Sequence, residues 1–292
     1  MLVSIPAAFC PILLMMKSLT PNPAVHTVLC GWNSQTTRLL DNLLAVPPKT
    51  QSGIVLVNQL DKAGIGALSD RFAGRDLATV TGDFTDEDVL RAAGIGTAAL
   101  AIIVPDYSMT IGSDSRGPDE RTILAALAIK SISPNIPVSA LVQNGENAIH
   151  LRHARVNTVI LQGEFSELAL SRTGLAPLLP DVLRTMLGPS GPAVLRQEPI
   201  PAQFSGTTFQ ELSRFFEMRN AGIVVGVVSK DRERGLAVLL DDTDSETDNF
   251  IKRKFQEAEL ELNGGDSQKA TIRLNPGADF PIGPHDTAFV IG

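Results

Sequence analysis

Apolar strand-like runs alternate with amphipathic helical runs from His26 onward, and this alternation restricts the fold more than any other feature of the sequence. The pattern is typical of βαβ units, whose strands lie parallel in one sheet with helices on both faces. The sequence therefore predicts an α/β fold built on a doubly wound parallel sheet. The predicted strands are 27–30, 54–57, 78–81, 99–104, 138–142 and 158–161, and the predicted helices are 36–45, 65–72, 86–93, 120–131 and 147–153.

The first βαβ unit opens with H-T-V-L-C-G-W-N-S-Q-T-T at 26–37, a short apolar strand followed by a glycine, a tight turn and the start of a helix. Such a turn presents backbone N–H groups at a helix N-terminus, where the helix dipole favours an anion such as a phosphate. The usual fingerprint G-x-G-x-x-G would place glycine at two positions where this chain has Asn33 and Thr36. The pattern therefore supports a nucleotide-binding fold more strongly than it supports a bound nucleotide.

Two further helices, 164–172 and 181–187, follow the last predicted strand and are separated by Pro177 and Pro180. Each has an apolar face to bury, and a neighbouring subunit is a natural place for it. A linker rich in Gly and Pro then leads to a smaller α+β domain, with predicted strands at 193–196, 223–228, 270–274 and 287–291 and a predicted helix at 208–218. The expected domains are an apolar N-terminal segment at 1–24, a sheet domain at 25–162, a helical crossover and dimerisation segment at 163–192, and an α+β domain at 193–292 with an acidic insert at 230–268.

Composition and charge argue against several classes of protein. The formal net charge of −7, without a cluster of Lys and Arg, argues against a nucleic-acid partner, because neutralising phosphates needs clustered positive charge. Cys10 and Cys30 are the two cysteines, which cannot form a disulfide framework, and a reducing compartment fits best. Residues 1–16 are apolar but fall short of the roughly 20 needed to cross a bilayer, so they are either the end of a helix that begins upstream or a disordered or mis-assigned terminus.

The order of several motifs resembles the regulator-of-potassium-conductance module, the sensing domain of prokaryotic potassium channels and Trk/Ktr-type transporters. The opening H-T-V-L-C-G-W-N at 26–33 is similar to that of the channel-linked members, and T-G-D-F-T at 81–85 is similar to the G-D-x-T of the third strand. Residues 119–130 look like the helix after the fourth strand, and A-D-F-P-I-G-P-H-D-T-A-F-V-I-G at 278–292 is similar to the end of the C-terminal subdomain. The resemblance covers nearly all of residues 26–292.

This resemblance implies a Rossmann-like subdomain, a helical crossover and a C-terminal subdomain that together form part of a gating ring controlling potassium flux. It further implies a homo-oligomer, either a dimer or an octameric ring, in the cytoplasm at the inner face of the cell membrane. The implied partner is a potassium channel pore or the membrane subunit of a transporter. A ligand with different affinities for two ring shapes would bias the pore, and the implied ligand is a nucleotide, NAD(H) or ATP/ADP, or an ion.

A bound nucleotide would lie along the carboxyl ends of the first four predicted strands. Its phosphates would lie over the turn after the first strand, with backbone N–H groups as donors, and a residue near the end of the second strand would hold the ribose. The ends of the third and fourth strands would complete the wall of the crevice. The candidate cofactor-binding residues are Gly31, Trp32, Asn33, Ser34, Asn58, Asp61, Gly82, Asp83 and Asp106.

Several of these candidates also have a purely structural interpretation. The second strand ends in Asn58 and Gln59, with Asp61 two residues later, so the usual acidic partner of the ribose is displaced. The structural roles we weigh are a tight turn for Gly82, a helix cap for Asp83, a solvated loop end for Asp106 and packing against the first helix for Trp32.

The sequence predicts no set of metal ligands. In one branch of the resembled family a calcium site uses a carboxylate after the fourth strand and two more on the fifth, where this chain has Leu141 and Gln143. The acidic stretch at 241–248 lacks the glycine and the glutamate that an EF-hand loop needs, and the four histidines lack the spacing of metal ligands.

Two other functions fit the same fold. A nicotinamide-dependent oxidoreductase would need a proton-transfer group, and the single tyrosine, Tyr107, has no lysine four residues on. An assembly subunit with a vestigial nucleotide pocket would account for the missing glycines. The sequence favours a regulatory module that is not an enzyme, with no catalytic residue assigned, and leaves the other two functions as alternatives.

Overall fold

The computed structural model describes residues 26–45, 53–108, 117–189, 191, 193–229 and 270–292. The chain divides into two compact units, the first ending at Arg172 and the second running from Thr173 to Gly292. This division falls inside the segment 163–192 that we predicted as one crossover. The predicted N-terminal segment at 1–24 and the acidic insert at 230–268 lie outside the described residues.

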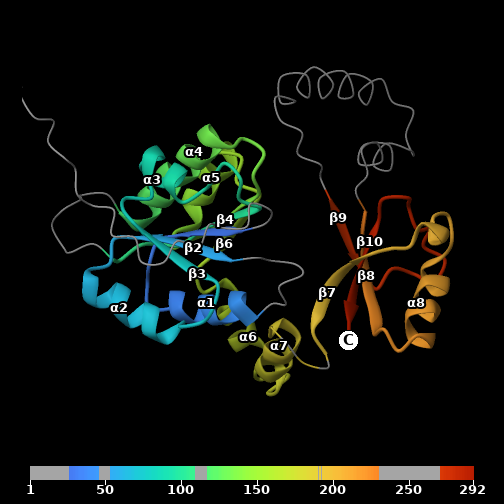
Figure 1. Ribbon diagram of the computed structural model, residues 1–292. Helices are drawn as coiled ribbons and strands as arrows, with labels where there is room; N and C mark the ends of the chain where they lie inside the picture. The colour runs from blue at the N-terminus through green and yellow to red at the C-terminus, as the bar shows by residue number, and fades with distance from the viewer. Residues whose placement is uncertain (1–25, 46–52, 109–116, 190, 192, 230–269) are drawn as a thin grey trace, which may run out of the picture. The chain divides into compact units, whose positions relative to one another are not determined.

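The first unit contains a six-stranded parallel sheet in the order β3-β2-β1-β4-β5-β6 (Figure 1). The strand order reverses between β1 and β4, which is the doubly wound topology that the sequence predicted. The strands are β1 (Thr27–Cys30), β2 (Ile54–Asn58), β3 (Leu77–Thr81), β4 (Leu100–Ile103), β5 (Val138–Val142) and β6 (Thr158–Leu161). The helices are α1 (Thr36–Ala45), α2 (Lys62–Arg71), α3 (Glu87–Ala92), α4 (Pro118–Ile132), α5 (Ala148–His153) and α6 (Glu164–Arg172), with a 3₁₀ turn at Gly145–Asn147.

Helices cover both faces of this sheet (Figure 1). On one face α1 and α2 contribute Leu40 and Leu68 to a core with β1 and β2, and on the other face α3, α4 and α5 contribute Leu90, Ile129 and Leu151. The central strands β1 and β2 are buried along their whole length, whereas β3 at the edge is largely exposed. A sheet covered on both faces explains why its central strands read as continuous apolar runs.

The helix that follows β3 begins with a different cap from the one that we considered. Asp86 caps α3, its side chain accepting the N–H of Asp88 at 2.8 Å. Glu87 and Asp88 lie in the first turn, where carboxylates complement the helix dipole. The interpretation of Asp83 as a helix cap was therefore wrong, and its carboxylate has other partners, described below.

The second unit contains a four-stranded antiparallel sheet in the order β7-β10-β8-β9. Helix α8 packs Phe209, Leu212 and Phe216 against one face of this sheet, and its first turn is closed by a capping box of Thr208 and Glu211. The α+β architecture of this half is as predicted. Its elements are α7 (Leu179–Leu187), β7 (Leu195–Pro199), a 3₁₀ turn at Ala202–Phe204, α8 (Phe209–Met218), β8 (Ile223–Ser229), β9 (Thr271–Leu274) and β10 (Thr287–Ile291).

Two predicted boundaries in this half are displaced. The first strand lies at Leu195–Pro199 instead of 193–196, since its register is set by pairing with β10, from Leu195 opposite Ile291 to Pro199 opposite Thr287. Helix α7 begins at Leu179, so Pro180 lies in its first turn and does not precede the helix. A proline is tolerated there because the first N–H groups of a helix have no partner within it.

Candidate functional site

The candidate cofactor-binding residues lie at the ends of four neighbouring strands. Residues 31–34 follow β1, Asn58 ends β2, Gly82 and Asp83 follow β3, and Asp106 follows β4. Because the carboxyl ends of parallel strands meet at one edge of a sheet, the fold brings these residues to a common edge at the topological switch point between β1 and β4 (Figure 1).

Gly31 makes the sharp turn out of β1. Its φ is +95°, and a Cβ at this position would lie 2.2 Å from the carbonyl oxygen of Val104. Its N–H donates to the carbonyl of Val57 at 3.0 Å. A side chain would therefore clash with the backbone that follows β4, and only glycine fits here.

The next two N–H groups of the turn donate to acceptors within the protein. The N–H of Trp32 donates to Oδ1 of Asp106 at 2.9 Å, and the N–H of Asn33 donates to Oγ1 of Thr36 at 2.9 Å. The Thr36 hydroxyl in turn donates to Oδ1 of Asn33 at 3.3 Å. The two residues that replace fingerprint glycines thus bind each other, and the turn as folded offers neither the Trp32 nor the Asn33 N–H to a phosphate.

The Asp106 carboxylate is buried beside the turn. The residue is 7% exposed, so its interpretation as a solvated loop end was wrong. Oδ1 accepts hydrogen bonds from the N–H of Trp32 and from the N–H and hydroxyl of Ser108, the last two at 3.1 and 2.7 Å. Oδ2 lies 3.5 Å from Nη2 of Arg121. These partners hold the carboxylate in one orientation against the turn.

Arg121 places a buried guanidinium at the same edge of the sheet. Its side chain is 3% exposed and extends from the first turn of α4. Besides facing Asp106, it pairs with Oδ1 of Asp83 at 3.2 Å and lies over the ring of Phe84, 4.9 Å from the centroid. Asp83 also accepts the N–H and hydroxyl of Thr85, at 2.9 and 2.8 Å. Arg121 therefore links the ends of β3 and β4.

The end of β2 presents amide side chains where a ribose would be held. Asn58 is fully buried, and its Oδ1 accepts the N–H of Leu60 at 2.9 Å. Nδ2 of Asn58 and Oε1 of Gln59 are buried and have no hydrogen-bond partner among the described residues. The carboxylate of Asp61 caps α2, accepting the N–H of Gly64 at 2.8 Å. The acidic side chain that follows β2 in the sequence is thus engaged in helix capping.

Trp32 has the packing role that we weighed from the sequence, and Cys30 is also buried in the core. Cys30 is fully buried, and burial raises the pKa of its thiol to about 12, with the negative charge of Asp106 acting in the same direction. Trp32 is partly buried against the core cluster that contains Leu29 of β1 and Leu40 of α1. Neither side chain is arranged as a reactive group.

Arg121, Ser108 and Thr36 belong to this network, and the sequence reasoning missed all three. One available signal was the position of Arg121 in the first turn of a helix, where a positive charge opposes the helix dipole. A buried arginine at such a position needs carboxylate partners. Which carboxylates pair with it depends on the strand order, which the sequence alone does not specify.

The described residues offer neither a metal site nor a membrane-spanning helix. They contain no group of three or more His, Cys, Asp or Glu side chains that could hold a metal ion. Gln143, at one of the positions considered for calcium, donates its N–H to Asp119 at 3.0 Å and its side-chain amide to the hydroxyl of Tyr107. No described helix is long and apolar enough to cross a membrane.

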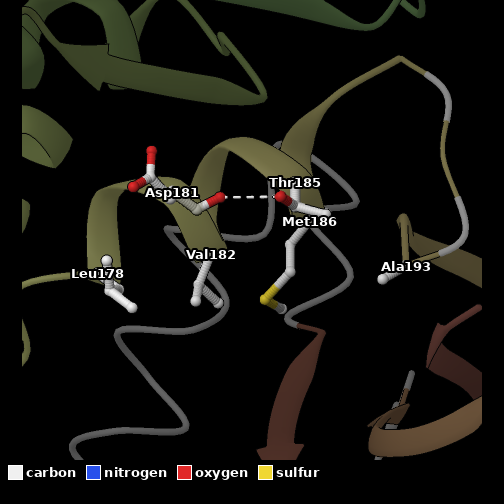
Figure 2. A pocket seen from close by; sticks show the side chains of 6 residues that line it. All are labelled: Leu178, Asp181, Val182, Thr185, Met186 and Ala193. Carbon is white, nitrogen blue, oxygen red and sulfur yellow. Dashed lines mark hydrogen bonds between the residues drawn. The ribbon is translucent and has the colours of Figure 1, made fainter.

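A separate apolar pocket lies in the second unit along α7 (Figure 2). Leu178, Val182 and Met186 recur at four-residue spacing and line it together with Ala193. The hydroxyl of Thr185 turns back to the carbonyl of Asp181 at 2.9 Å, which leaves the lining largely apolar. This surface is suited to packing and has no arrangement of groups for chemistry.

Comparison with known proteins gives the family of the first unit. Residues 27–162 match the TrkA-N domain, so the match runs from the first residue of β1 to the residue after β6. The chain is 24% identical over 213 residues to the calcium-gated potassium channel TvoK of Thermoplasma volcanium, which covers 73% of this chain and 52% of that protein. This chain therefore spans about half the length of that relative.

A solved structure shares the fold over most of the chain. The human SLO3 gating ring superposes with a TM-score of 0.57 at 13% identity, covering 91% of this chain and 44% of that chain. The motifs at 26–33 and 81–85 that carried the family resemblance both lie inside the TrkA-N match. The family match, the strand order and the relatives agree, and residues 27–162 of this chain belong to the TrkA-N domain family.

Proposed function

We propose that this chain is a regulatory module that controls potassium flux through a membrane channel or transporter from the cytoplasmic side of the membrane. The observation that carries the proposal is the alignment to a potassium channel over 213 residues. This alignment is longer than the TrkA-N stretch and extends past residue 162, so the similarity includes residues beyond the sheet domain.

The helices between the two sheets support assembly into a homo-oligomer. On α6, Phe165 and Leu168 are 64% and 57% exposed, and in the second unit Leu178 and Val182 are 70% and 49% exposed. Apolar side chains at this spacing on a helix normally pack against another surface. A second copy of the chain would bury them, as a dimer or as part of a larger ring.

Deletion of the gene in its own host tests the proposed function. We expect loss of the gene to change the uptake of potassium, or of rubidium as its tracer, in potassium-starved cells, and a plasmid copy to restore uptake. The empty plasmid is the control. Identical uptake with and without the gene over a wide range of external potassium would contradict the proposal.

The ligand of the module is a separate proposal. The fold favours a nucleotide, NAD(H) or ATP/ADP, at the edge formed by residues 31–34, Asn58, Gly82 and Asp83. The internal partners of the turn N–H groups weigh against it and favour the second candidate function, an assembly subunit with a vestigial pocket. A thermal-shift screen separates the two, because a ligand at about 100 times its dissociation constant stabilises by about 2.7 kcal/mol. No shift with ATP, ADP, NAD or NADH favours the vestigial pocket.

A further inference from the structure

The turn after β1 already binds an anionic group of the protein itself, the carboxylate of Asp106. Oδ1 of Asp106 lies 2.9 Å from the N–H of Trp32, one of the donors that a dinucleotide phosphate would use. The side chain of Asp106 is fully buried, so its carboxylate is withdrawn from solvent and cannot easily be exchanged for another acceptor.

The surroundings of Asp106 are built for a negative charge. Three hydrogen-bond donors converge on Oδ1, from Trp32 and from both groups of Ser108. The Arg121 guanidinium, itself buried, lies 3.5 Å from Oδ2, an ion-pair contact that is the charge partner of an oxygen with no hydrogen bond among the described residues. Ser108 is held in turn, since its Oγ accepts the N–H of Gln59 at 3.1 Å. A buried charge is stable in a protein only when it is paired and hydrogen-bonded in this way.

The rest of the turn is closed by the residues that depart from the glycine fingerprint. Thr36 is 1% exposed, and its Oγ1 accepts the Asn33 N–H. Oδ1 of Asn33 accepts the N–H of Gln35 at 2.9 Å, and Nδ2 of Asn33 donates to the carbonyl of Pro105 at 3.0 Å. Side chains thus occupy the space and the donors that glycine would leave to a pyrophosphate.

We propose that the carboxylate of Asp106 is an internal substitute for a ligand phosphate, which excludes the pyrophosphate of a dinucleotide from the turn at residues 31–34. Arg121, which also pairs with Asp83, lies beside the Asp106 carboxylate at the position where the fold normally receives an anion. This assignment holds whether or not the chain regulates potassium flux. A nucleotide that binds this chain must then place its phosphates elsewhere or displace the carboxylate.

Removal of the carboxylate tests this assignment by chemical rescue. In Asp106→Ala the N–H of Trp32 and the guanidinium of Arg121 lose a shared anionic partner, so we expect a lower melting temperature. Pyrophosphate or formate should then raise it by roughly 5 °C or more at saturation, relative to sodium chloride of the same ionic strength. The wild-type chain should show no such rise.

A matched control variant is Asp119→Ala. Asp119 is also a buried carboxylate of this unit and accepts the N–H groups of Gln143 and Asn144 at 3.0 and 2.9 Å, away from the turn. Rescue confined to Asp106→Ala supports the assignment. Equal rescue of both variants, or no rescue of a folded Asp106→Ala, would overturn it.

The wild-type chain provides a second test that does not depend on a variant folding. Trp32 is the only tryptophan in the chain, so tryptophan fluorescence reports on the turn alone. We expect millimolar pyrophosphate to leave its emission unchanged after correction for absorbance. A saturable change with pyrophosphate would show a phosphate on the turn and overturn the assignment, whatever the outcome of the potassium uptake experiment.

Discussion

The buried thiol of Cys30, on the central strand β1, makes the stability of the fold depend on pH. Burial raises the pKa of its thiol from 9.0 to about 12, and the negative charge of Asp106 adds to the shift. Because the folded pKa is the higher one, the stabilisation is fully present below pH 9 and is lost as the pH rises toward 12, since the unfolded chain ionises first.

We expect the Cys30→Val chain to lose less stability in alkali than the wild type. Between pH 8 and about 10.5 the thiol should lower the free energy of unfolding of the wild type by about 2 kcal/mol, and valine removes this contribution. Urea unfolding of both chains at both pH values measures it. The change in unfolding free energy between the two pH values is compared for the two chains, so the contributions of titratable groups present in both cancel. Equal losses of stability in the two chains would contradict the expected result.

Two variants of Asp61 distinguish a helix-capping role of this residue from a ligand-binding role. The Asp61→Ala chain should lose about 1 kcal/mol of stability, because the cap of α2 is lost. Asp61→Asn, which can still cap the helix, should lose little. If Asp61 held a ribose instead, both variants would weaken any stabilisation by NAD, and urea unfolding with and without NAD separates the two roles.

Residue roles were predictable from the sequence where they depend on near neighbours. The buried thiol of Cys30 and the packing of Trp32 follow from a short apolar strand and the turn after it. Asp106 was misjudged because its partners, Trp32 and Arg121, come from other parts of the chain. Their proximity arises only when β1 lies beside β4.

At the scale of elements, α6 and α7 each carry apolar side chains that are exposed among the described residues. Leu168 on α6 and Val182 on α7 remain about half exposed, at 57% and 49%. An aspartate at either position would place a charge in the proposed interface between two copies, where its desolvation is unfavourable.

We therefore expect Leu168→Asp or Val182→Asp to reduce the oligomer to smaller species in light scattering at micromolar concentration. Arg184→Ala is the matched control for Val182→Asp, since it lies on the same helix, is exposed, and changes the net charge by the same amount. An oligomer unchanged by either aspartate, or disrupted equally by the control, would contradict an interface at these helices.

The elements were predictable because each is signalled by its own residues. The strands β1 and β2 are continuous apolar runs, and α3 follows an Asp-Glu-Asp start. Strand β7 was displaced because Arg196 to Pro199 lack an apolar pattern and owe their extended form to pairing with β10. Pairing of this kind links positions almost a hundred residues apart, which local patterns do not encode.

At the scale of the whole molecule, the same sheet could support either regulation or redox chemistry. We expect no oxidation of NADH by the purified chain with a panel of aldehydes and ketones, measured by loss of NADH absorbance. Tyr107, the only tyrosine, shares its hydroxyl with the side chain of Gln143 and has no lysine four residues on. Turnover that is abolished in Tyr107→Phe would contradict this expectation.

The fold class of the molecule was predictable from the sequence. Whether the crevice at the edge of the sheet is open to a ligand was not. Alternating patterns indicated a parallel sheet, and right-handed crossovers leave few other ways to arrange it. Whether the turn at Trp32 is open to a ligand depends on Asp106, Ser108 and Arg121, which become neighbours only in the folded chain.

Gly31 is needed because the turn passes very close to the backbone that follows β4. With 2.2 Å between a Cβ at this position and the Val104 oxygen, even alanine would force the two central strands apart. The first glycine of the fingerprint is thus required by the architecture, whereas the same turn forms with Asn33 and Thr36 at the other two glycine positions. A glycine at such a bend is therefore explained by the backbone geometry alone and is not evidence for a bound nucleotide.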